Sequence, residues 1–95
     1  MSFDTVHNYY DRLVFNEINE NYKDKNLSYH QLEDMACIAL NRLPPRYIRF
    51  DIDMSFYLSA DEYFQIHRKV AKAVRKAYKK IIKLDGLKGH HSQEE

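Results

Sequence analysis

The 95-residue sequence is poor in several residue types: it has one cysteine, Cys37, no tryptophan, two glycines and two prolines. A single cysteine excludes an internal disulfide and is typical of proteins from a reducing compartment. With only Gly86 and Gly89, the chain has no glycine-rich phosphate-binding loop. No apolar run approaches the roughly 18 residues of a membrane-spanning helix, and residues 1–4 lack the basic and apolar regions of a signal peptide. We therefore expect a cytoplasmic protein without a membrane partner.

The length and composition predict one soluble domain. At 95 residues the chain has room for a single hydrophobic core, and 44% apolar with 31% charged residues is typical of a folded soluble protein. We expect residues 1–88 to form the domain and residues 89–95 to form a flexible polar tail. Eight tyrosines and five phenylalanines exceed what so small a core needs, which favours a homodimer with part of this aromatic surface at the interface.

The charges are divided unevenly along the chain, although the formal net charge is only +1. Residues 1–34 carry seven acids and three bases, a net charge of −4. Residues 59–88 carry three acids and nine bases, a net charge of +6. Two regions of opposite sign can pair within one molecule or across a dimer, and the basic region can instead attract phosphates.

The spacing of apolar residues predicts a long helix in each half of the chain. The first helix is expected from about Asp4 to Asn21, capped by Asp4 or Ser2. The last helix is expected to begin at a capping box of Ser59 and Glu62 and to stop at Gly86. The predicted buried stripes are Phe3, Val6, Tyr10, Leu13, Val14 and Ile18 in the first, and Tyr63, Ile66, Val70, Val74, Ala77, Tyr78 and Ile81 in the last.

A middle helix is predicted between them, and two prolines end it. Ser28 and Gln31 have the spacing of a capping box, which indicates the start of this helix. Pro44 bars the residue before it from α geometry, and neither proline has a backbone N–H to donate, so the helix must end near Arg42. Polar side chains held at so stiff a corner lose little entropy when they bind a ligand.

After the prolines, apolar and polar residues alternate from residue 47 to residue 54, as in a half-buried strand. An isolated strand leaves its amides unsatisfied, so this one needs a partner. We expect either a short pairing with residues 56–58 or pairing with the same strand of a second copy, and the aromatic surplus favours the second. The predicted fold class is mainly α: a small three-helix domain with one short β segment after the Pro-Pro corner.

Four polar side chains gather at this corner: Asn41, Arg42, Arg46 and Tyr47. Guanidiniums match phosphate oxygens bidentately, an amide can read a base edge, and a tyrosine ring or an arginine plane can stack on a base. These residues therefore predict a site for an anion with a base. The structural alternative is that Asn41 caps the helix while Arg42 or Arg46 pairs with Asp34 or Asp51, and the sequence leaves both open.

The same region carries a family resemblance. The string Asp34-Met35-Ala36-Cys37-Ile38, followed by Leu40-Asn41-Arg42-Leu43-Pro44-Pro45-Arg46-Tyr47, resembles the late competence development protein ComFB family. The similarity extends from about Asn8 to about Tyr78. Some members of this family are reported to bind cyclic dinucleotides such as cyclic di-GMP. The resemblance implies a ligand with two phosphates and two guanines, whose two-fold symmetry a homodimer could match.

Asp34 is added to the predicted ligand site because it lies seven residues, two helical turns, before Asn41. It could accept a hydrogen bond from a guanine edge or orient Arg42. The alternative is a solvated acid near the start of a helix, where the helix dipole favours negative charge.

The predicted last helix is strongly basic. Its cations Arg68, Lys69, Lys72, Arg75, Lys76, Lys79, Lys80 and Lys83 occupy the positions that the buried stripe leaves free. They are expected to form the solvated face of an amphipathic helix. Dense positive charge also attracts phosphate, and competence is a DNA-uptake process, so nonspecific nucleic-acid binding through this helix is an alternative function.

Metal and catalytic sites are not predicted. Some relatives of the family bind zinc through clustered cysteines near the start of the second helix, but residues 25–33 contain none here. The five histidines lack ligand spacing on one face, and Cys37 is expected to be a small core residue without a neighbouring base. We therefore expect a non-enzyme without a cofactor.

The sequence thus predicts a homodimeric regulatory module of the ComFB type that binds a cyclic dinucleotide and acts through an unidentified protein partner. Arg42 and Arg46 would hold the phosphates, Tyr47 or an arginine plane would stack, and Asp34 and Asn41 would contact base edges. The alternatives are an interaction protein without a ligand, serving competence or surface behaviour, and the nucleic-acid binder.

Overall fold

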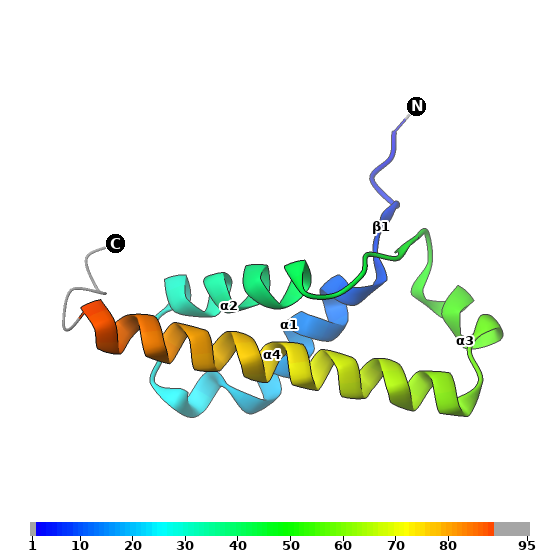
Figure 1. Ribbon diagram of the computed structural model, residues 1–95. Helices are drawn as coiled ribbons and strands as arrows, with labels where there is room; N and C mark the ends of the chain where they lie inside the picture. Colours follow the sequence, from blue (N-terminus) through cyan, green and yellow to red (C-terminus); the bar gives the residue numbers. More distant parts are fainter. Residues whose placement is uncertain (1, 89–95) are drawn as a thin grey trace.

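A computed structural model of the chain describes residues 2–88 and is mainly helical (Figure 1). Three longer helices, α1 (Tyr9–Asn21), α2 (Tyr29–Asn41) and α4 (Ala60–Lys88), are accompanied by the short helix α3 (Met54–Tyr57). Single 3-10 turns, η1 (Lys23–Lys25) and η2 (Asp51–Asp53), lie in the connections. The strands β1 (His7–Asn8) and β2 (Tyr47–Ile48) form one small sheet. The predicted fold class is confirmed.

The core lies where α1 and α2 pack along α4 (Figure 1). Each of these helices contributes a side chain without solvent exposure, because apolar residues at helical spacing place one stripe toward the other two helices. The most completely buried large side chains are Val14, Met35, Met54 and Val74. Of the predicted stripe of the last helix, the buried residues are Ile66, Val70, Val74, Ala77 and Ile81.

The predicted caps of the second and last helices are confirmed. The Ser28 hydroxyl accepts from the backbone N–H of Gln31 at 3.1 Å, and the Gln31 side chain accepts from the Ser28 N–H at 2.8 Å. Ser59 and Glu62 make the same pair of bonds at the start of α4. As Pro44 requires, α2 ends at Asn41.

The predicted start of the first helix is wrong. The helix α1 begins at Tyr9, and Asn8 is its N-cap in place of Asp4 or Ser2. His7 cannot be helical because it forms strand β1 with Asn8. As a result Phe3 and Val6, which were assigned to the buried stripe, are exposed.

The predicted strand over residues 47–54 is also too long. Only Tyr47 and Ile48 form a strand, and after Phe50 the chain turns into η2 and α3, where the N–H of Asp53 donates to the carbonyl of Phe50. Strand β2 pairs antiparallel with β1 of the same chain, His7 opposite Ile48, rather than with residues 56–58. The amides of β2 therefore have hydrogen-bond partners in residues 7–8, a segment for which the spacing of apolar residues predicts a helix.

Three smaller expectations are corrected as well. The helix α4 continues through Gly86 to Lys88, so that glycine does not stop it. Tyr63 is 49% exposed, because the first turns of α4 extend beyond α1 and α2 (Figure 1). Cys37 is exposed and is not a core residue.

The tail predicted over residues 89–95 lies outside the described residues. Within residues 2–88, no helix combines the length and apolarity needed to cross a membrane.

Candidate functional site

The corner, here defined as residues Arg42 to Tyr47, is fixed to the start of α1 by one side chain. The Asn8 Oδ1 atom accepts from the backbone N–H of Tyr10 at 3.3 Å and from the backbone N–H of Arg46 at 2.9 Å. The Arg46 carbonyl in turn accepts from the N–H of Tyr9 at 2.7 Å. Two prolines and the two hydrogen bonds of the Arg46 backbone leave the corner little freedom.

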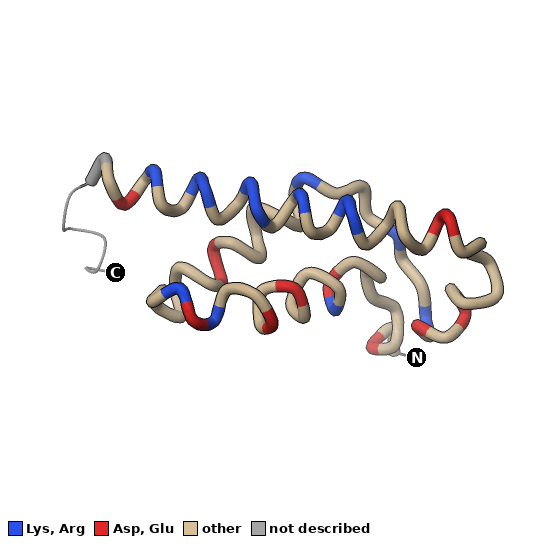
Figure 2. Tube along the Cα trace, turned by 90° about the horizontal axis from the view of Figure 1, so that it is seen from below, with Lys and Arg blue, Asp and Glu red and all other residues tan. Residues whose placement is uncertain are grey.

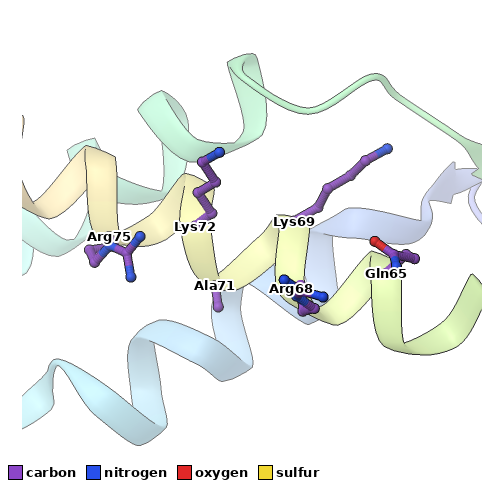
Figure 3. A pocket seen from close by; sticks show the side chains of 6 residues that line it. All are labelled: Gln65, Arg68, Lys69, Ala71, Lys72 and Arg75. Atoms are coloured by element: carbon purple, nitrogen blue, oxygen red, sulfur yellow. The ribbon is translucent and has the colours of Figure 1, made fainter. Parts of the chain in front are cut away.

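A cationic hollow of about 210 Å³, which we name the corner cleft, lies between the corner and α4. Four cationic residues line it: Arg42, Lys69, Lys72 and Lys76. Three small or apolar residues line the rest: Leu43, Pro44 and Ala73. In Figure 3, the side chains of Lys69 and Lys72 extend from α4 toward α2 and the chain that follows it. The cleft therefore offers cations around an apolar surface, an arrangement suited to an anion that also carries a flat or apolar part.

A second hollow, of about 300 Å³, adjoins the corner cleft, because Lys69 lines both. We name it the Arg46 hollow, after the other arginine of the corner. Its polar residues from α4 are Asp61, Glu62 and Gln65 in addition to Lys69, and its aromatic residue is Tyr10. This hollow has charges of both signs, together with an amide that can donate and accept hydrogen bonds.

The structure separates the five predicted site residues. All five are exposed, and the structural alternative of a carboxylate partner for Arg42 or Arg46 is not seen, because within residues 2–88 neither makes an ion pair. Arg42 lines the corner cleft and Arg46 lines the adjoining hollow. Asp34 and Asn41 share the outer face of α2, with Asn41 about 100° around the helix from Arg42, and neither lines the cleft. Tyr47 is 68% exposed on β2.

Asp51 has partners other than the corner arginines. Its Oδ1 atom lies 2.8 Å from the Nε2 atom of His7, and its Oδ2 atom lies 3.2 Å from the Nε atom of Arg12. The other ring nitrogen of His7 lies 2.9 Å from the carbonyl of Thr5. The hydrogen bond to Asp51, followed by that to Thr5, raises the pKa of His7 above its ordinary value. These groups, which we name the His7 clasp, connect β1, α1 and η2.

The sequence reasoning missed the two features that build the corner site. The α4 lysines of the cleft were assigned to a solvated face, although Lys69, Lys72 and Lys76 recur at three and four residues along one edge of the helix. The predicted first helix includes Asn8 as an interior residue. Asparagine is a preferred N-cap residue, and the buried Tyr9 and Tyr10 follow it, which is the signal that could have identified the cap.

A third hollow lies at the α3 end of the molecule, and exposed apolar residues are frequent in the same part of the chain. The hollow has a volume of about 470 Å³ and includes Tyr9, Met54, Leu58, Tyr63 and Phe64 in its lining. The exposed large apolar residues between residues 47 and 64 are Tyr47, Phe50, Ile52, Phe56, Tyr57, Tyr63 and Phe64. We name these seven residues the aromatic surface. Their exposed side chains are available for apolar contacts.

The structure also bears on a metal site. Within the part of the chain that the structure describes, no three His, Cys, Asp or Glu residues lie together as metal ligands would.

Fold and site together define a class: small, mainly helical proteins with an open cationic cleft at a proline-bound corner. The family model of the late competence development protein ComFB matches residues 7–84, most of the chain, and the protein belongs to this family. Membership relates it to late competence development. Neither the curated proteins nor the solved structures provided a match.

Proposed function

We propose that this protein is a non-enzymatic regulatory module that binds a cyclic dinucleotide of the cyclic di-GMP type at the corner and acts through a protein partner in the cytoplasm. One observation carries the proposal: Arg42 and three lysines of α4 surround the corner cleft, and Arg42 has no carboxylate partner among residues 2–88. The fixed corner backbone supports it, because a preorganised site loses little entropy on binding.

The two adjoining hollows suggest how such a ligand would lie. One phosphate would contact Arg42 and Lys72 in the corner cleft, and Lys69, which lines both hollows, would contact the ligand between them. A base would then reach the Arg46 hollow, where a guanidinium plane can stack on it and Gln65 can hydrogen-bond its edge. Asp34 and Asn41 lie away from this path and line neither hollow, so we propose the base-edge contacts for Gln65 instead.

A homodimer is part of the proposal. A cyclic dinucleotide has two-fold symmetry, and a symmetric dimer presents two equal sites to it. The aromatic surface supports self-association, since seven exposed large apolar residues lie within 18 positions of the chain.

Calorimetry with the double variant R42A/R46A tests the proposal. We expect wild-type protein to release heat with cyclic di-GMP and the variant to lose at least tenfold in affinity, because each lost charged hydrogen bond weakens binding by about 1.5–3 kcal/mol. The variant should keep its helical circular dichroism, since both side chains are exposed. The matched control is K23A/K25A, two exposed cations of η1 that lie outside both hollows.

Three results would contradict the proposal. No heat with cyclic di-GMP, cyclic di-AMP or a linear dinucleotide at micromolar wild-type protein would refute it. Equal heats for wild type and R42A/R46A would move the ligand away from the corner. A variant that loses stability rather than ligand would support the alternative of an interaction protein, in which the corner only fixes the geometry of helix and strand.

A further inference from the structure

The exposed side of α4 is cationic over most of its length. From residue 68 to residue 83 the helix carries eight lysines and arginines and no acid, and all eight are exposed. We name this set the basic ridge. At 1.5 Å per residue it extends over about 22 Å. In Figure 2, the blue positions recur along α4, whereas the red positions lie at its ends and on other segments.

The ridge is costly for an isolated helix. Like charges stand four residues apart at Arg68 and Lys72 and again at Arg75 and Lys79, and such pairs destabilise a helix by a few tenths of a kcal/mol each. An ordinary solvated face mixes the two signs and gains from the same spacing. Within residues 2–88 no cation of the ridge makes an ion pair. No carboxylate among residues 2–88 therefore neutralises the ridge through an ion pair.

The residues around the ridge favour a nucleic acid over a membrane or an acidic protein as its binding partner. Amphipathic membrane helices insert an apolar face, but the apolar face of α4 is buried against α1 and α2. A stable protein interface needs apolar anchors, and among the exposed residues from 68 to 83 only Ile82, 43% exposed, is apolar. Sugar-phosphate backbones need only dense positive charge. Arg68 and Arg75 line a shallow open hollow of about 460 Å³ on the surface of α4, and Figure 3 shows their side chains.

We propose that the basic ridge of α4 is a sequence-independent binding surface for the phosphate backbone of a nucleic acid. Eight charges over about 22 Å correspond to one charge per roughly 3 Å, of the same order as the phosphate spacing of a nucleic-acid strand. The ridge shares Lys69, Lys72 and Lys76 with the corner cleft and extends beyond it, because its other five cations do not line the cleft. The inference does not depend on the proposed function.

The test is fluorescence anisotropy with a labelled 20-nucleotide single strand and a 20-base-pair duplex over a series of salt concentrations. The wild-type protein should bind both, with a logarithmic affinity that falls linearly with logarithmic salt concentration. In R75Q/K79Q the slope should decrease by about 1.8 for the duplex and about 1.4 for the single strand, because two phosphate contacts are lost. At 0.1 M salt this corresponds to an affinity loss of about 60-fold and about 25-fold.

The matched control is K23Q/K25Q, which removes the same charge from η1 and should keep the wild-type slope. Calorimetry should show that R75Q/K79Q still binds the dinucleotide, which separates this surface from the corner. Removing like-charge pairs should leave the melting temperature of R75Q/K79Q unchanged or slightly higher.

Four outcomes would overturn the proposal. They are no binding of either nucleic acid by wild type at 50 mM salt, an unchanged slope in R75Q/K79Q, and an equal change in K23Q/K25Q. The fourth is tighter binding to polyglutamate, or to vesicles that contain phosphatidylserine, than to both nucleic acids, which would assign the ridge to an acidic protein or a membrane surface.

Discussion

Asn8 shows how one short side chain can join two distant parts of the chain. Its Oδ1 atom caps α1 through Tyr10 and also accepts the Arg46 N–H, which lies 38 positions away in the sequence. Without this acceptor the Arg46 N–H would need another partner, since a backbone donor without one costs free energy. The position of the corner over α4 therefore depends on this amide.

Replacement of Asn8 by alanine is expected to lower the free energy of unfolding by about 1–2 kcal/mol, mainly from the lost cap, because the Arg46 N–H is exposed and water can replace its acceptor. Urea denaturation followed by circular dichroism measures it. The control is N16A, an exposed position within α1 where alanine favours the helix, and it should be neutral or stabilising. An N8A variant as stable as N16A would contradict the two roles assigned to Asn8.

At the scale of elements, the His7 clasp couples the stability of β1 to pH. Both nitrogens of His7 face oxygen acceptors, the carboxylate of Asp51 and the carbonyl of Thr5, so only the protonated ring can donate to both. Arg12 and Asp11 of α1 are the other charged groups that face it. Because the pKa of His7 is raised in the folded protein, its contribution is full below the unfolded pKa of about 6.5 and is lost as pH rises through the folded pKa.

We therefore expect the wild-type protein to lose stability relative to H7Q as the pH rises from 5.5 to 8, because glutamine does not titrate. Urea midpoints at four pH values in this range would measure the difference. H30Q is the matched control, since it removes a histidine of α2 that contacts Glu33, at 4.0 Å, and no group of the clasp. Parallel curves for wild type and H7Q would refute the clasp.

Local signals were sufficient for most of the helices. The capping boxes at Ser28 and Ser59 and the stop at Pro44 are chemical features of a few adjacent residues, and the structure contains all of them. The sheet was not predictable in this way. His7 and Asn8 lie within a stretch whose apolar residues have helical spacing. They form a strand because they pair with Ile48 and Tyr47, about 40 positions away in the sequence. A tertiary contact overrides the local pattern here.

The sequence indicates only those features of the candidate site that depend on adjacent residues. Arg42 and Arg46 are displayed by the corner, which the prolines indicate from sequence. Their surroundings come from α4, and the helical period says which residues face outward but not which of them lie against the corner. Lys69, which lines both hollows, therefore could be found only in the folded molecule.

On the scale of the whole molecule, charge and aromatic surface are separated. The basic ridge lies on the middle and later part of α4, whereas the aromatic surface lies on the segment from β2 through η2 to α3 and on the first turns of α4 (Figure 1). Self-association through the aromatic surface would therefore leave the ridge open. A dimer built in this way could bind an anion while remaining a dimer.

Replacement of Phe56, which is 80% exposed on α3, by aspartate is expected to convert the proposed dimer to a monomer, because a charge at an apolar interface would be desolvated. Sedimentation equilibrium at about 100 μM protein measures the mass. The control is Y29D, since Tyr29 is 84% exposed at the first position of α2 and lies outside the aromatic surface. A wild-type monomer, or a dimeric F56D, would exclude this interface.

The pairing of β1 with β2 also bears on the order in which the chain folds. The His7–Asp51 contact closes a loop of 44 positions, whereas the helices form from neighbours along the chain. Loop closure of this length costs entropy that only the assembled helices can offset. The amino-terminal strand should dock last and detach first, so the amide protons at this end of the protein should exchange with solvent before those of the interior.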